Sequence, residues 1–153
     1  MKNKSVFGFE RAADSPGFLL WQTTMMWQRL IKKELEPFEI SHAQFVVMAV
    51  ICWFEEHEQM ATQAALISWT KLDKMTVSQA LKKLAYVGLV QRADHEIDTR
   101  AKTVALTAAG TELIVKLVPL VEQIDANFFG KISISEQADL IHMLSAVTGG
   151  KDE

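Results

Sequence analysis

The chain has 153 residues, a formal net charge of −3 and a hydrophobic content of 49%, which suits one domain with its own core and room for helical extensions used in assembly. Its single cysteine, Cys52, excludes an intramolecular disulfide and is typical of a reducing cytoplasm. The longest apolar run, residues 45–54, has about half of the ~20 residues that a membrane helix needs, so we expect a cytoplasmic protein with no membrane span.

The first two helices are predicted from their caps. Ser15–Pro16 starts a helix that Pro37 ends, and its apolar residues cover more than one face, which predicts burial against a second copy of the chain. A capping box at residues 41–44 starts a second helix that reaches about Glu56. The apolar run inside it would also suit a buried strand, but the cap and the lack of alternation favour a central core helix.

Two short helices follow. Thr62 caps the first, at about residues 63–71, and Asp73 caps the second, at residues 74–87, which ends at Gly88. The second helix has one apolar face with i, i+4, i+7 spacing, made of Val77, Leu81 and Leu84. Two helices joined by a turn of three or four residues, with the second polar on its outer face, form a helix-turn-helix.

The remainder is predicted as a hairpin and two helices. Residues 89–92 and 102–106 are predicted strands joined by a polar link. Thr107 caps a long helix that continues to Phe128, in which Pro119 should cause a kink or an interruption. A capping box at residues 133–136 starts the last helix, and no linker is long enough to separate two domains.

A helix-turn-helix followed by strand, charged loop and strand is a winged helix. The motifs MTVSQALKKL (residues 75–84), GLVQR (88–92), Asp-x-Arg at Asp98 and Arg100, and LT-x-x-G ending at Gly110 resemble the MarR-type transcriptional regulators, and the resemblance covers nearly the whole chain. It implies a mainly α fold with a small β-hairpin wing, in a single domain over residues 1–153. Residues 15–36 and 108–148 would be the N- and C-terminal dimerisation helices, and residues 41–107 the winged helix-turn-helix lobe.

The resemblance also implies a function. The chain would be a homodimer that binds a pseudo-palindromic site in double-stranded DNA, as a repressor released by a small ligand. The charge distribution is compatible with this, because residues 71–102 carry seven basic and four acidic residues, a net charge of +3 that leaves −6 for the remainder. An ordinary solvated face would give the same pattern. The alternative function is a protein-interaction winged helix with little DNA affinity.

Side-chain chemistry divides the DNA-binding candidates on the second helix of the motif. Thr76, Ser78 and Gln79 lie at its exposed N-terminal end, where a glutamine can pair with adenine and a threonine methyl can contact thymine. Lys82 and Lys83, one turn further, are expected to contact phosphates, which position the protein and make binding salt-dependent.

Further DNA contacts are expected from the preceding helix and the wing. Thr62 and Gln63 can hold a phosphate at a helix N-terminus. Arg100 can enter a minor groove from the wing, next to the basic Lys102. Asp98 is expected to shape the wing by accepting hydrogen bonds, with a plain turn residue as the alternative. The positions of Gln79 and Thr99 are often basic in the family, so phosphate attraction is expected to be weaker here.

The remaining candidates concern a small-molecule site. Trp21, Met25 and His42 are the candidate lining of a pocket for a small aromatic or phenolic effector, although a Trp/Met stripe also suits a plain core. Cys52 lies in an apolar run, as an inert hydrophobic residue rather than a redox sensor. No histidine pairs with cysteine or carboxylate at a metal-ligand spacing, and adjacent Ser41 and His42 cannot face each other as nucleophile and base. We therefore expect no metal, no cofactor and no catalysis.

Overall fold

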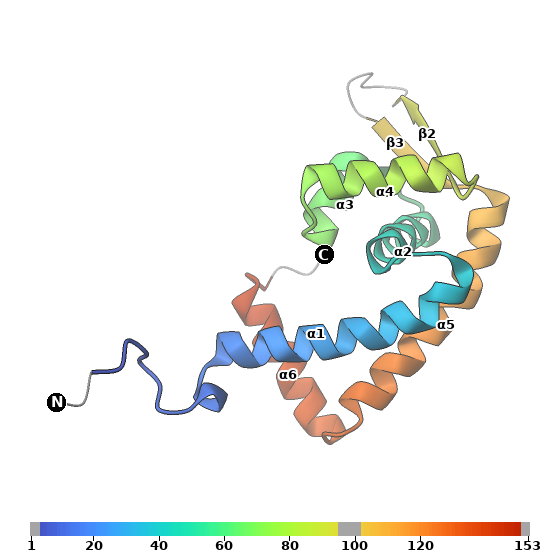
Figure 1. Ribbon diagram of the computed structural model, residues 1–153. Coiled ribbons are helices and arrows are strands. Elements are labelled where there is room, and N and C mark those ends of the chain that lie inside the picture. The colour runs from blue at the N-terminus through green and yellow to red at the C-terminus, as the bar shows by residue number, and fades with distance from the viewer. Residues whose placement is uncertain (1–3, 95–101, 151–153) are drawn as a thin grey trace.

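The structure is a computed structural model that describes residues 4–94 and 102–150 (Figure 1). Its helices are α1 (Pro16–Leu35), α2 (His42–Glu56), α3 (Gln63–Thr70), α4 (Lys74–Tyr86), α5 (Ala108–Phe129) and α6 (Ile134–Val147), with short 3-10 turns at Ala12–Asp14 and Glu36–Phe38. Its strands are β1 (Ala61–Thr62), β2 (Val90–Asp94) and β3 (Lys102–Leu106). The helices and the hairpin predicted from the sequence are confirmed.

Each predicted helix cap is present as a hydrogen bond. Ser15 Oγ accepts from the Phe18 N–H at 3.2 Å, and Thr62 Oγ1 accepts from the Ala65 N–H at 3.1 Å. The capping boxes at the starts of α2 and α6 are both complete, with side chain and backbone bonded reciprocally. These caps satisfy backbone N–H groups that have no partner inside their helix, which is why the sequence located the helix starts well.

The wing has a third strand that the sequence did not predict. The sheet order is β1-β3-β2, antiparallel throughout, with Ala61 opposite Val104 and Val90 opposite Leu106. The expected two-stranded hairpin is therefore the outer part of a three-stranded sheet. β1 has only two residues, which is too short for an alternating pattern to appear in the sequence.

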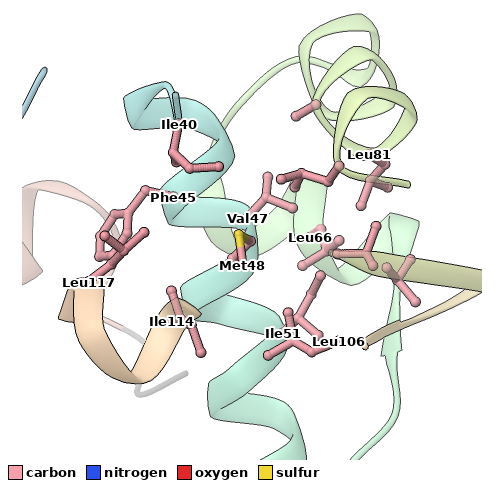
Figure 2. Packing of buried hydrophobic residues seen from close by; sticks show 14 of the residues in the cluster. Ile40, Phe45, Val47, Met48, Ile51, Leu66, Leu81, Leu106, Ile114 and Leu117 are labelled. Carbon is pink, nitrogen blue, oxygen red and sulfur yellow. The ribbon is translucent and has the colours of Figure 1, made fainter. Parts of the chain in front are cut away.

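The core surrounds α2, as the cap at Ser41 predicted. Phe45, Val47, Met48, Ile51 and Phe54 are buried on it, in one cluster with side chains from all of the helices except α6 and from all three strands. Figure 2 shows Ile114 and Leu117 of α5 on one side of α2 and Leu66 and Leu81 on the other. Because α2 contacts both the wing side and α5, it fixes the helix-turn-helix on the rest of the molecule.

Pro119 does not interrupt the last part of the fold. α5 is one curved helix from Ala108 to Phe129, with Pro119 inside it (Figure 1). The proline removes the hydrogen bond to the carbonyl of Val115, and Val115 is 64% exposed, so water can satisfy that carbonyl. Of the two expected effects, the interruption is wrong, because the proline lies on the side of the helix that faces solvent in a single chain, whereas the curvature of α5 agrees with the expected kink.

Large apolar side chains remain exposed at both ends of the chain. α6 has no buried residue, and α1 buries only Ile31 and Leu35. The exposed set comprises Val6, Phe7 and Phe9 before α1, Phe18, Leu19, Leu20, Trp21, Met26 and Leu30 on α1, and Ile134, Ile141, Met143, Leu144 and Val147 on α6. Within the described residues, no single helix combines the length and apolar character needed to cross a membrane, although Pro16–Phe38 and His42–Glu56 reach that level together across an 82° bend.

Candidate nucleic-acid interface

The helix-turn-helix holds α4 by one face and exposes the other. A three-residue turn, residues 71–73, separates α3 from α4, in which Lys71 adopts a left-handed conformation with φ 58°. Val77, Leu81 and Leu84 of α4 are fully buried, as the spacing predicted. The opposite side of α4 therefore faces solvent on a helix that cannot rotate without exposing its apolar face.

The exposed face of α4 differs in part from the predicted one. Gln79, Lys82 and Lys83 are exposed as expected, and they are joined by Met75, 69% exposed, and Tyr86, 86% exposed. These five positions follow the helical repeat opposite Val77, Leu81 and Leu84 and are called the α4 stripe below. The helical period places Tyr86 on this outer face, although it was not a DNA-contact candidate, and it would also have found Met75. Met75 was missed because only polar side chains were taken for the outer face.

Thr76 and Ser78 flank this stripe instead of lying on it, and both are half-buried. The Thr76 N–H donates to Asp73 Oδ1 at 2.7 Å, and its hydroxyl donates to Asp73 Oδ2 at 2.9 Å. These bonds, the backbone one first, hold the pKa of Asp73 below its ordinary value. The N-terminal end of α4 therefore carries a carboxylate, which repels phosphate, so the lysines more than two turns further along the helix are the better candidates for phosphate contacts.

Thr62 and Gln63 lie where β1 ends and α3 begins. Thr62 belongs to β1, opposite Thr103, and its hydroxyl oxygen is engaged in capping α3. Both residues are half-buried. Their expected phosphate contact therefore depends on the backbone N–H groups at the start of α3.

The base of the wing is fixed to the lobe by backbone and side-chain bonds. The Leu106 N–H at the end of β3 donates to Glu55 Oε1 of α2 at 2.9 Å, and the Thr103 hydroxyl donates to the Ala93 carbonyl at 3.1 Å. Lys102 is exposed at the start of β3. Arg100 and Asp98 lie outside the described residues, so their expected roles stay predictions. The role of Glu55 was not predicted, because its partner is 51 residues away in the sequence.

The start of α5 is held against the end of α4. The Thr107 hydroxyl donates to the Gly88 carbonyl at 2.6 Å, and the Thr107 N–H donates to the Leu89 carbonyl at 3.0 Å. Gly88 has φ 79°, the left-handed conformation predicted for the end of this helix. These hydrogen bonds therefore join the start of α5 to the segment that links α4 to the wing.

The chain is similar in sequence and fold to known transcriptional regulators. Residues 36–123 match the model of the ArnR1-like winged-helix domain. The chain is 37% identical over 115 residues to the HTH-type transcriptional regulator YdcH of Bacillus subtilis, covering 75% of this chain and 78% of that one. The chain belongs to the MarR family of winged helix-turn-helix transcriptional regulators.

Two further relatives agree with this assignment. The chain is 27% identical over 128 residues to the HTH-type transcriptional repressor NicR of Pseudomonas putida, covering 84% of this chain and 78% of that one. A cysteine-to-serine mutant of Escherichia coli MarR complexed with operator DNA is 26% identical, with a TM-score of 0.75, and the match covers 86% of this chain and 91% of that one. The chain is thus a DNA-binding transcriptional regulator.

Away from α4 and the wing, this MarR-family chain has a cavity of about 500 Å³ between α1 and the start of α2. It brings together Met25 and His42, two of the three predicted effector-pocket residues. Trp21 does not line it and is 61% exposed on α1. The cavity is lined by Met25, Gln28, Arg29, Lys32, Glu36, Glu39, Ile40, Ser41 and His42.

The tryptophan that packs beside this cavity is Trp27. Its ring meets the His42 ring edge-on at a centroid distance of 5.1 Å, and its Nε1–H donates to Asp125 Oδ1 of α5 at 2.7 Å. Burial lowers the pKa of His42, and Asp125 opposes this only in part. A neutral imidazole at pH 7 leaves Arg29 and Lys32 as the cationic groups of the cavity.

Cys52 is half-buried on α2, more accessible than its apolar sequence context indicated. Its Sγ lies 4.0 Å from Glu56 Oε1. Burial, and then the carboxylates of Glu56 and Glu55, raise the pKa of the thiol. This setting is the opposite of the electropositive one that activates a redox-sensing cysteine. Within residues 4–94 and 102–150, no cluster of three His, Cys, Asp or Glu side chains could hold a metal ion.

Proposed function

We propose that the chain is a homodimeric, cytoplasmic repressor. It binds a pseudo-palindromic operator through α4 and the wing, and a small aromatic or phenolic effector releases it. The observation that carries the proposal is the α4 stripe, in which Gln79 stands one turn before Lys82 and Lys83 on a helix locked by its buried face. A glutamine can read a base edge, while the lysines neutralise phosphates.

The exposed ends of the chain support a dimer. α1 and α6 leave large apolar side chains exposed in the described part of the chain, and α6 has no buried residue. A second copy related by a two-fold axis would cover both helices and pair two basic lobes, which fits a site with two half-sites. The NicR relative is a repressor, which supports the same sign of regulation here.

Dimerisation and DNA binding are tested separately. Size-exclusion chromatography with light scattering should give twice the chain mass of 17.2 kDa. Affinity for a promoter-fragment pool should fall steeply with salt, and Lys82→Ala and Arg100→Ala should weaken it, whereas Lys116→Ala on α5 should not. A monomer contradicts the dimer, and DNA binding that is absent or insensitive to salt leaves the protein-interaction module as the function.

The cavity between α1 and α2 supports the effector. Met25 and Ile40 offer apolar contact to a ring, and the neutral His42 can exchange hydrogen bonds. Arg29 and Lys32 can pair with an acidic substituent, while Glu36 and Glu39, which balance their formal charge in the same lining, can accept from a phenol hydroxyl. We therefore expect a phenolic carboxylate, with 4-hydroxybenzoate as the first probe. Titration calorimetry should show binding that Arg29→Ala weakens and Lys33→Ala, outside the lining, does not. Equal binding by both variants would place the effector elsewhere.

A further inference from the structure

The C-terminal part of the α4 stripe continues into a basic surface at the junction between α4 and the wing. Gln79, Lys82, Lys83, Ala85 and Tyr86 of α4 form an open concave surface with Arg92 of β2, with a volume of about 520 Å³. Figure 1 shows the hairpin rising from the C-terminal end of α4, which brings these two elements together. Arg92 and Tyr86 were not among the predicted DNA-binding residues.

Strand geometry explains how Arg92 reaches this surface. Arg92 stands opposite Val104, and alternate residues of a strand share a face, so Arg92 lies on the same face as Val90. Val90 and Val104 are buried in the core, whereas Arg92 is exposed on the edge strand of the sheet. The Arg92 side chain therefore projects from the sheet at the edge of the core, next to the last turn of α4.

The charges of this surface suit an anion. Three cations line it and no carboxylate does. Among the ion pairs of the described residues, none involves Lys82, Lys83 or Arg92, so no carboxylate in residues 4–94 and 102–150 pairs with these three charges. The Lys83 ammonium lies 5.9 Å from the centroid of the Tyr86 ring, a cation–π distance, so the phenol stands beside a positive charge with its hydroxyl free to donate.

The length of α4 indicates which anion meets this surface. Thirteen residues make a helix about 20 Å long, whereas the major groove is about 12 Å wide. A helix that presents its first turns to base edges therefore extends beyond the groove, and its last turn meets the phosphates on the groove wall. That last turn carries Lys83 and Tyr86, and Arg92 lies next to it.

We propose that Arg92, Lys83 and Tyr86 form a phosphate clamp that binds the DNA sugar–phosphate chain at the edge of the groove entered by α4. This rests on the proposed function, since it requires that α4 enter DNA. The clamp sets the depth and direction of α4 while leaving base choice to Gln79 and its neighbours. Its occupant is a phosphodiester of duplex DNA, because the cations continue directly from the base-reading end of the same helix.

The test is the salt dependence of binding to a fluorescent mixed-sequence duplex of about 30 base pairs, three helical turns. Each lost phosphate contact should make the slope of log affinity against log salt less steep by about 0.9, or about 1.8 for a dimer. Arg92→Gln should show this change. The ratio of the wild-type DNA affinity to that of Arg92→Gln should therefore fall about 12-fold between 50 and 200 mM salt. Arg92→Lys should restore the slope. Tyr86→Phe, which removes one hydroxyl from an exposed ring, should lower affinity about 2- to 10-fold without changing the slope.

Lys116→Ala, which removes an equal charge from an exposed position on α5, is the matched control and should leave the slope unchanged. A slope for Arg92→Gln equal to that of the wild type, while Lys82→Ala shows a reduced one, overturns the clamp and leaves the proposed function standing. A wild-type protein that binds no duplex at low salt overturns both. Melting curves of each variant, matched to the wild type, exclude loss of fold as the cause.

Discussion

Replacing Gly110 by alanine should damage the junction between the wing and α5. Gly110 is buried in the first turn of α5, and a Cβ atom built there would lie 2.0 Å from the Leu89 carbonyl oxygen and 3.0 Å from its carbon. Both neighbours are backbone, so no side-chain rotation relieves the contact. Either α5 or the strand start at Leu89 has to move by about 1 Å or more, because packed interiors have no room for the extra atom.

The loss of stability follows from what this movement disrupts. Inserting an atom into a packed site costs about 1–3 kcal/mol. The hydrogen bond from the Thr107 N–H to the same Leu89 carbonyl, 3.0 Å long, would lengthen or break at a further cost of about 1 kcal/mol. A total of about 2–4 kcal/mol corresponds to a drop in melting temperature of about 4–16 °C for a chain of this size.

The assay is a thermal melt at fixed protomer concentration, since the midpoint of a dimer depends on concentration. Gly17→Ala is the matched control, because nothing lies within 4 Å of the added atom in the first turn of α1. It should stabilise slightly, by up to about 1 kcal/mol. Melting of Gly110→Ala at or above the wild-type temperature would refute the reasoning, and unchanged DNA affinity would refute the link between this junction and the wing.

Three other substitutions have expected outcomes. Glu55→Ala should remove the acceptor of the Leu106 N–H, lower the free energy of unfolding by about 1 kcal/mol or more and weaken DNA binding. Glu55→Gln keeps an acceptor oxygen and is the control. Equal melting temperatures for both variants and the wild type would contradict this prediction. The folded-state pKa of Asp73 lies below its unfolded value near 3.8, so the stability that its ionised carboxylate contributes is complete above that pH and is lost as the pH falls through the folded pKa. The difference in melting temperature between wild type and Asp73→Ala should therefore shrink below about pH 4. A constant difference down to about pH 2 would be the opposite result. Because the pKa of Cys52 is raised, iodoacetamide should alkylate the native chain at pH 7 more slowly than the urea-unfolded chain. Cys52→Ser should keep the DNA affinity of the wild type. Rapid alkylation of the native chain would instead indicate an activated thiol.

Local chemistry decided which features the sequence could predict. The helix starts at Ser15, Ser41, Asp73 and Thr107 were found because a capping side chain acts on backbone N–H groups only a few residues away. The same reasoning could not find the bond from Glu55 to Leu106, because its two ends are brought together only by the packing of α2 against β3. β1 was missed for a related reason, since two residues become a strand only when β3 supplies the partner.

The residues of the candidate site also divide into those that residue type and local position predict and those that only the fold explains. Gln79, Lys82 and Lys83 were found from residue type and helical position, and the structure exposes all three. Thr76 was assigned to base reading from its type, but its hydroxyl is bonded to Asp73, which leaves its methyl group for any contact with a base. Gly110 shows the converse. The last position of the LT-x-x-G motif indicated only a family resemblance in the sequence, and the structure gives its cause, a backbone approach that leaves no space for a Cβ.

α2 connects the cavity to the wing through its own two ends. Its first residue, His42, lines the cavity and contacts Trp27, which in turn is bonded to Asp125 of α5. Glu55, near its last residue, accepts from Leu106 at the base of the wing. Between them the helix is packed on several sides, and its two ends lie about 20 Å apart. If the proposed effector binds in this cavity, a shift of His42 relative to Trp27 would act on the helix that holds the wing, without any contact between the ligand and α4.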